Sequence, residues 1–155
     1  SIGLTKSDKR LYMGLTSPKQ KHSIRGVRSR LMSKLRNAFE QRAEQAEIIR
    51  AKADSLHAAQ PEAVVMICGD FNDTPMSYTY NQMLNAGLKD AFITASKGIG
   101  KTYCGRLPLL RIDYFWYNDN IEIVDYNRIK QTTSDHYPLL ISFNIKEAEE
   151  LGEEQ

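Results

Sequence analysis

The spacing of apolar residues in the first half of the chain predicts one long amphipathic helix. From Val27 to Ala59 such residues recur three, four or seven positions apart, and charged residues fill the other faces. Gly26 weakens a helix that begins before it, although Ser17-Pro18 resembles an N-cap and first turn. We therefore expect the helix to begin near Val27 and to end before Pro61. The apolar positions are Leu31, Leu35, Ala38, Phe39, Ala46, Ile49, Ala53 and Leu56.

The next pattern predicts a core strand followed by a short helix. The run 63–68 is apolar, partly β-branched and followed by Gly69, so it indicates a buried strand with Cys68 as a packed thiol. Residues 77–86 predict a helix that Gly87 terminates. Its inner side would carry Tyr78, Met83 and Leu84.

The rest of the chain predicts a largely antiparallel sheet. Asn118-Asp119-Asn120 separates two apolar runs and is a hairpin signal. Pro138 stands at the start of the last run, where a strand tolerates proline. The order of helix, strand, helix and several strands favours an α+β fold. The expected segments are a loop at 90–100 and strands at 101–104, 112–117, 121–126 and 137–145.

Composition and charge limit the class of protein. The 155 residues suffice for one domain, and the 41% hydrophobic and 26% charged shares are typical of a globular protein. No apolar run is long enough to cross a bilayer, and the first residues carry no secretory signal pattern. Two cysteines are too few for a disulfide framework.

The two parts of the chain differ in charge. Residues 1–56 hold thirteen Lys/Arg and five Asp/Glu, a formal charge of +8, whereas residues 57–155 hold eight and fourteen, a charge of −6. A basic arm beside an acidic half is compatible with holding a polyanion near metal-binding carboxylates. It is equally compatible with an ordinary solvated helix face.

The segment Gly69-Asp70-Phe71-Asn72-Asp73-Thr74-Pro75, directly after the expected core strand, carries most of the chemistry. Residues two apart on an extended chain point the same way, so Asp70 and Asn72 would face one site while Phe71 turns into the core. A carboxylate beside an amide suits phosphoryl chemistry, because the amide donates to a phosphate oxygen without adding negative charge. The same residues are also typical of a plain turn, in which Asp and Asn bond to their own backbone.

Two later motifs favour the functional interpretation. They are Arg111-Ile112-Asp113-Tyr114-Phe115-Trp116 and Ser134-Asp135-His136-Tyr137-Pro138-Leu139, each beside an expected strand. Together with the segment at 69–75, over roughly residues 60–143, they resemble the C-terminal half of the endonuclease/exonuclease/phosphatase superfamily. The resemblance implies half of a deoxyribonuclease-I-like, four-layer α/β sandwich with a mostly antiparallel sheet and the long amphipathic helix.

The resemblance also implies catalytic roles. Asp70 would position or deprotonate the attacking water, and Asn72 would bind the phosphoryl group in the transition state. His136 would contact the scissile phosphate, with Asp113 accepting a hydrogen bond from its ring. That pair also makes independent sense, since a carboxylate behind an imidazole fixes the tautomer and favours the charged form. The alternatives are that Asp113 pairs with Arg111 and that His136 is a core or turn histidine.

Mg²⁺, with Mn²⁺ as a possible substitute, is the implied cofactor. Asp135 would help to hold it, directly or through water, together with Asp70, since Mg²⁺ prefers oxygen ligands and keeps several waters. Tyr103 and Lys101 would contact the substrate, although packing explains Tyr103 at least as well. The implied substrate is a phosphate ester, with nucleic acid slightly favoured over phospholipid or inositol phosphate.

The resemblance covers only part of the family pattern. Members carry an early glutamate as the main metal ligand, an early supporting asparagine and a His-Leu-Gln-like stretch, and none of these occurs in this sequence. We therefore expect a C-terminal portion that lacks its N-terminal half and has little activity alone. A sheet face without its cover would self-associate or leave the fold loose.

The expected division is a basic, partly mobile segment at 1–26, the half-domain at 27–145 and an acidic tail at 146–155. Two other functions remain open. One is a non-catalytic module of the same fold that binds nucleic acid or protein. The other is a helical interaction protein built on the long helix.

Overall fold

The structure, a computed structural model, describes residues 24–105, 110–130 and 133–146, and within the first helix it describes side chains from Met32 onward. The chain consists of two compact units, residues 1–45 and 46–155. The expected cap at Ser17-Pro18 and almost all of the basic segment and the acidic tail lie outside the described residues.

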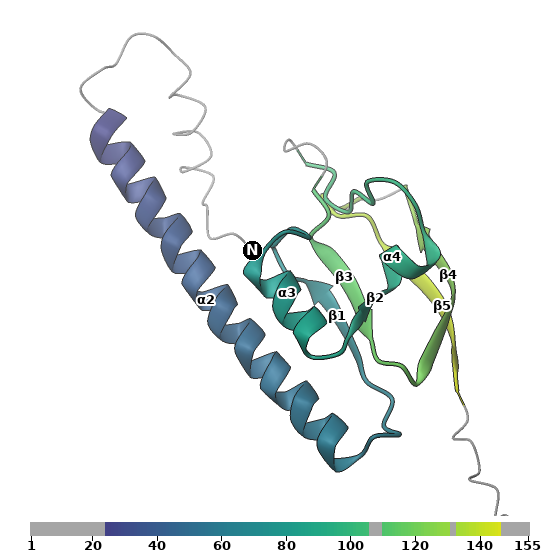
Figure 1. Ribbon diagram of the computed structural model, residues 1–155. Coiled ribbons are helices and arrows are strands. Elements are labelled where there is room, and N and C mark those ends of the chain that lie inside the picture. The colour runs from purple at the N-terminus through teal and green to yellow at the C-terminus, as the bar shows by residue number, and fades with distance from the viewer. Residues whose placement is uncertain (1–23, 106–109, 131–132, 147–155) are drawn as a thin grey trace, which may run out of the picture. The chain divides into compact units, whose positions relative to one another are not determined.

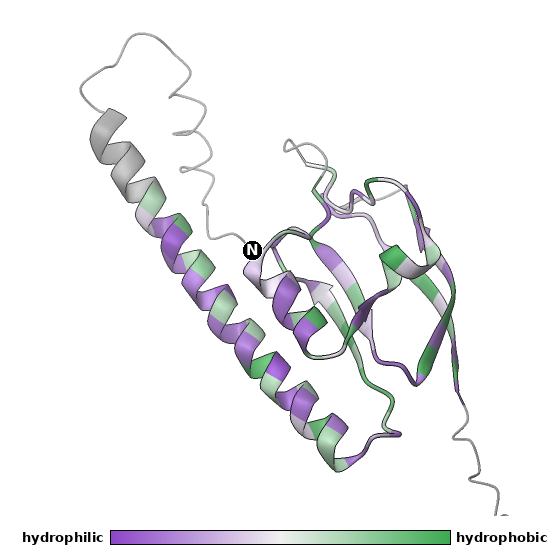
Figure 2. Ribbon diagram, viewed as in Figure 1, coloured by the Kyte–Doolittle hydropathy of each residue, from purple (hydrophilic) through white to green (hydrophobic). Residues whose placement is uncertain are grey.

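The long helix is present as α2 (Ile24–Ala59), so it already includes Gly26, against the expectation of a start at Val27. Hydrophobic and hydrophilic residues are interspersed along it, as its amphipathic pattern requires (Figure 2). Ala46 and Ala53, in the part of α2 that belongs to the second unit, are buried. Among the described residues, no helix combines the length and the apolar character that a membrane span requires.

The described strands form two antiparallel sheets (Figure 1). The first contains β1 (Met66–Asp70), β3 (Asp113–Tyr117) and β2 (Lys89–Asp90), in the order β1-β3-β2. The second pairs β4 (Ile121–Arg128) with β5 (Leu139–Ile145). Together with the helices they give the α+β class that the sequence predicts.

Strand β3 connects two hydrophobic cores because its side chains alternate between the two faces of the first sheet. Tyr114 and Trp116 pack in one core with residues of α2 and α3 (Tyr78–Asn85). Phe115 and Tyr117 pack in the other core with residues of α4 (Ala91–Ala95) and β4. The first sheet therefore lies between a helical layer and the second sheet.

The expected hairpin between the runs at 112–117 and 121–126 is wrong, because β3 and β4 belong to different sheets. Asn118 exchanges backbone and side-chain hydrogen bonds with the segment before β1, donating to the Ala63 carbonyl at 2.7 Å and accepting from the Val65 amide at 3.1 Å. The side chain of Asn120 binds the carbonyls of Pro61 and Ala63. These asparagines therefore form a corner that carries the chain from one sheet to the other.

Three other expectations need correction. The segment 90–100 is not a plain loop, since it begins with the end of β2 and the helix α4. Residues 101–104 form no strand, and Tyr103 makes only an isolated bridge to His136. Cys68 is exposed instead of packed, because only one face of β1 is covered within the described residues.

The short helix α3 follows the prediction at both ends. The Ser77 side chain accepts from the Tyr80 amide at its N-cap, and Gly87, with φ 72°, follows its C-cap. Its inner side is only partly as expected. Met83 is buried, whereas Tyr78 and Leu84 are about half exposed and polar Thr79 and Gln82 take their place.

Candidate active site

Two carboxylates meet where β1 ends and β3 begins. Asp70, the last residue of β1, stands opposite Asp113, the first residue of β3, in the antiparallel register. Residues directly opposite on neighbouring strands have adjacent side chains, and two negative charges at such a position repel each other. A cationic group or a metal ion beside the pair would relieve this repulsion.

Asn72 follows Asp70 in a tight turn and not on an extended strand. Its amide nitrogen donates to Asp70 Oδ1 at 2.8 Å, and its side-chain nitrogen donates to Oδ2 at 3.0 Å. Among the described non-glycine residues only Asn72 has a positive φ, 51°, a conformation that asparagine tolerates better than most residues. The turn interpretation is therefore confirmed, and Asn72 does not follow Asp70 on an extended strand. Phe71 packs edge-on against the core ring of Tyr114, as expected.

His136 contacts the second carboxylate directly. Its Nδ1 lies 2.9 Å from Asp113 Oδ2 and 3.1 Å from Oδ1. Partial burial alone would lower the pKa of His136, but the hydrogen bond and charge of Asp113 outweigh it, with further help from Asp70 and Asp135, so the pKa is raised. The charged form of the imidazole is therefore favoured.

The segment around Thr102 holds both His136 and Asp113 in place. The backbone of residues 102–104 runs beside that of residues 135–137, joined by the bonds Tyr137 N to Thr102 O and Cys104 N to Asp135 O. The fully buried Thr102 hydroxyl accepts from the amides of Ile112 and Asp113, at 3.0 and 3.1 Å. One threonine thus orients the start of β3 and the strand-like segment that carries His136.

Arg111, one of the alternatives for Asp113, pairs instead with Asp90. Both side chains are buried, and the Arg111 guanidinium donates to Asp90 Oδ2 at 2.5 Å. Asp90 also accepts from the Tyr80 hydroxyl and caps α4 through the Phe92 amide. This pair is a structural support that leaves the carboxylate of Asp113 to His136.

The predicted site residues divide into a central group and a periphery. Asp70, Asp113 and His136 each offer a ligand atom, and these atoms lie within 4.8 Å of one another. Asn72 joins the group through Asp70, and the Tyr103 ring packs edge-on against the His136 imidazole at 5.2 Å. Asp135 and Lys101 are outside the three-residue group. The side chain of Asp135 is exposed, and Lys101 lines a neighbouring hollow.

Comparison with known proteins identifies the relationship. The family model described as endonuclease/exonuclease/phosphatase family matches residues 19–136, which is most of the chain. The chain belongs to this family. No curated protein sequence gave a significant match.

Solved structures of the family share the fold. An endonuclease/exonuclease/phosphatase protein from Bacteroides vulgatus is 24% identical over 69% of this chain and 45% of its own, with a TM-score of 0.58. The mannosyl-6-phosphatase of Bacteroides thetaiotaomicron is 19% identical over 68% of this chain and 46% of its own, at 0.55. The human Nocturnin catalytic domain with bound sulfate is 17% identical over 70% of this chain and 42% of its own, at 0.57. The chain thus spans less than half the length of these family members.

The sequence analysis missed two residues, Thr102 and Asp90, whose hydrogen bonds support the candidate active site. Thr102 stands beside Tyr103, but only the packed structure shows that its hydroxyl serves two amides of β3. Asp90 lies 21 residues before Arg111 in the chain, and no spacing rule connects the two. The cation of Arg111, directly before the apolar run of β3, was a usable signal that an acid elsewhere in the chain pairs with it.

Proposed function

We propose that this chain is the C-terminal part of a metal-dependent phosphoester hydrolase. The observation that supports it is the convergence of Asp70, Asp113 and His136, from three separate segments, with ligand atoms within 4.8 Å of one another. Membership of the family supports the reaction class. The two named relatives, a phosphatase and Nocturnin with its bound sulfate, support a phosphate ester as the substrate.

Each residue of the candidate site has its own role in the proposed reaction. Asp113 holds the imidazole of His136 in one tautomer, with Nδ1 toward the carboxylate and Nε2 toward a phosphoryl oxygen. The charge of the imidazole stabilises the negative charge that develops on that oxygen. Asp70 accepts the proton of the attacking water, and the side-chain amide of Asn72, which now binds Asp70, turns to donate to the substrate.

The donor set suits an oxygen-preferring divalent ion. Asp70 is exposed, and each of its carboxylate oxygens, which accept one hydrogen bond from Asn72, has a further lone pair for a metal ion, whereas Asp113 and Nδ1 of His136 already bind each other. Asp70, with Asp135 from the neighbouring loop, would therefore hold Mg²⁺ or Mn²⁺, which keeps several waters and needs few protein ligands. When bound, the ion supplies charge stabilisation to the phosphate.

The chain covers less than half the length of the solved relatives. We propose residues 27–145 as the half-domain, with its N-terminal half as the missing partner and with little activity in this chain alone. Nucleic acid is the substrate class favoured slightly over phospholipid or inositol phosphate. A non-catalytic module that keeps the fold is disfavoured, because such a scaffold needs no carboxylate-buttressed imidazole.

An assay with bis(4-nitrophenyl) phosphate and either Mg²⁺ or Mn²⁺ tests the proposal. We expect slow turnover at most, abolished by Asp70→Ala and by His136→Ala but unchanged by His57→Ala, which removes an exposed histidine from α2. In parallel, Mn²⁺ should broaden the NMR signals of residues 70–73 and 134–136 in the unsubstituted chain and not in Asp70→Ala.

The outcomes separate the two parts of the proposal. Robust turnover that both substitutions abolish would refute the low activity of the chain while supporting the hydrolase. Turnover that survives both substitutions, or Mn²⁺ broadening that Asp70→Ala leaves unchanged, would refute the site itself.

A further inference from the structure

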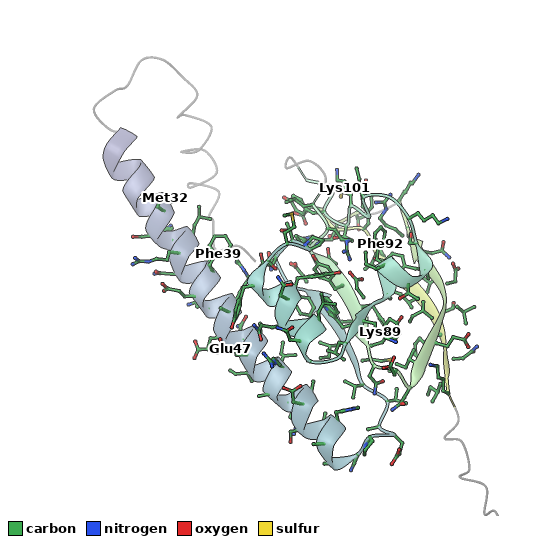
Figure 3. The ribbon with its side chains drawn as sticks, in the orientation of Figure 1. Met32, Phe39, Glu47, Lys89, Phe92 and Lys101 are labelled. Atoms are coloured by element: carbon green, nitrogen blue, oxygen red, sulfur yellow. The ribbon has the colours of Figure 1, made fainter. Side chains whose placement is uncertain are left out.

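A hollow is lined by residues that are close in sequence to those of the candidate active site. Its volume is about 660 Å³, which is within the range of small-molecule sites. Two lining residues, Lys101 and Tyr137, stand next in sequence to Thr102 and His136. Phe92 of α4, the loop 96–100 and the end of β4 complete it, and Phe92 and Lys101 lie toward the same end of this unit (Figure 3).

The loop that forms one wall is packed closely onto Phe92. Gly100 has a φ of 65°, and a Cβ at this position would lie 2.5 Å from the ring of Phe92. Any residue other than glycine would therefore push the loop away and change the shape of the hollow.

The charged side chains among the described lining residues are all positive. They are Lys97, Lys101, Arg128 and Lys130, and no Asp or Glu occurs in this described part of the lining. Four like charges around a concave surface repel one another and attract anions, because the low-dielectric walls focus the field. The hollow is thus electrostatically complementary to a compact polyanion.

The wall also contains two hydrogen-bond donors without acceptors. Tyr126 is only 8% exposed, and its buried hydroxyl has no hydrogen-bond partner. Burial raises its pKa to about 12, so this hydroxyl is a donor at neutral pH. Arg128 donates from Nη1 to the Lys101 carbonyl and lies 5.3 Å from the Tyr137 ring, yet its Nε is also unpaired.

Both unpaired atoms are shielded from solvent in this arrangement. An incoming anion would first contact the exposed Lys97 and Lys130. It would reach the Tyr126 hydroxyl and Arg128 Nε after flexible side chains change conformation. Unpaired buried donors readily donate to a phosphate oxygen, because a buried donor without a partner destabilises the protein.

The aromatic residues do not offer a stacking surface. Phe92 is 6% exposed, and the ring of Tyr126 packs edge-on against it at 5.5 Å. A nucleobase would find no free ring face on Phe92 or Tyr126, and the Arg128 guanidinium lies over the ring of Tyr137, so the hollow favours a compact anion over a flat ring.

We propose that this hollow, lined by Lys97, Lys101, Tyr126, Arg128 and Lys130, binds a phosphate group. In the intact enzyme it takes a second, non-scissile phosphate of the substrate, beside the one at His136. This last clause rests on the proposed function, whereas phosphate binding in the hollow does not.

An NMR titration of the ¹⁵N-labelled chain with inorganic phosphate tests the proposal, since amide shifts report each site separately. We expect saturable shifts at residues 97–101 and 128–130. The double substitution Lys97→Ala/Lys130→Ala should weaken these shifts at least tenfold in apparent Kd. The matched control, Lys52→Ala/Lys146→Ala, removes the same charge from exposed positions outside the hollow and should leave the Kd within twofold.

Two further variants separate this site from the catalytic one. Tyr126→Phe keeps the ring and should weaken phosphate binding in the hollow severalfold, with thermal unfolding showing that the fold is retained. His136→Ala should abolish phosphate-induced shifts near residues 134–136 and leave those of the hollow unchanged.

The opposite results are equally clear. Absence of saturable shifts at residues 97–101 and 128–130, or equal weakening by the control pair, would overturn the phosphate pocket whatever happens at His136. If the unsubstituted chain showed saturable shifts in the hollow and none near residues 134–136, the proposed function would be contradicted and the phosphate pocket would stand.

Discussion

His136 and Asp113 meet although they are 23 positions apart in the chain, with Nδ1 of the imidazole 2.9 Å from the nearer carboxylate oxygen. The contact joins the loop before β5 to the first residue of β3, and it is the means by which the fold prepares a charged imidazole.

Substituting Asp113 by asparagine should lower the pKa of His136. The carboxylate holds that pKa above its ordinary value against the opposing effect of burial, so its removal favours the neutral ring. An NMR titration of the imidazole in the metal-free chain measures the shift. Glu122→Gln, an exposed change on β4, is the control and should leave the pKa unchanged.

The sign of the effect on stability follows from the same shift. Because the folded pKa of His136 is raised, its contribution is complete below the unfolded pKa, about 6.5, and is lost as the pH rises through the folded pKa. An unchanged His136 titration in Asp113→Asn would show that the observed contact does not control the charge.

Thr102→Val should destabilise the protein by about 2 kcal/mol, because two buried amides, those of Ile112 and Asp113, lose their common acceptor. Thr102→Ser keeps the hydroxyl and should cost clearly less. Urea unfolding compares the two. If Thr102→Val were no more destabilising than Thr102→Ser, the hydroxyl would contribute no more to stability than the packing of the methyl group, which would contradict this role.

Asp90→Ala should destabilise the protein by about 3–5 kcal/mol, because it leaves the buried Arg111 charge without a partner. The matched control is the surface ion pair between Lys89, the neighbour of Asp90 in sequence, and Asp119. Asp119→Ala should change the free energy of unfolding by less than about 0.5 kcal/mol, since both side chains are mostly exposed. Chemical denaturation that ranks the two variants equally would contradict the structural role of the Arg111–Asp90 pair.

The chain should self-associate through the uncovered face of β1. Met66 is 44% exposed there, and Cys68 beside it on the same face is exposed as well. Sedimentation at increasing concentration should show association that Met66→Lys weakens. Ile93→Lys, which changes an exposed residue of α4, should have no such effect. A compact monomer at high micromolar concentration would exclude this interface.

Local patterns account for much of the fold. The 3.6-residue period predicts α2, and the Ser77 cap with Gly87 predicts both ends of α3. The order of the three motifs predicts that Asp70, Asp113 and His136 share a site, and in the structure their ligand atoms lie within 4.8 Å of one another. The assignment of their catalytic roles is still a prediction.

Other features depend on partners that lie far apart in the chain. The Asn118 turn looks like a hairpin, but its side chain binds Ala63 and Val65, so the two strands go to different sheets. Arg111 finds Asp90 and not the nearby Asp113. Cys68 is exposed because the apolar character of a strand does not say which of its faces another layer covers.

The amino-acid order by itself determined that the segments of α2 and α3 are helical, where Asp70, Asp113 and His136 stand in the chain and which reaction class they suit, because these depend on neighbours within a few residues. Only the tertiary structure decided which acid pairs with Arg111, which threonine holds Asp113 and His136 in place, and that cationic side chains gather around one hollow. Such pairings are chosen by the burial of whole layers, where an unpaired charge or amide is costly, and that choice is made by packing between distant segments.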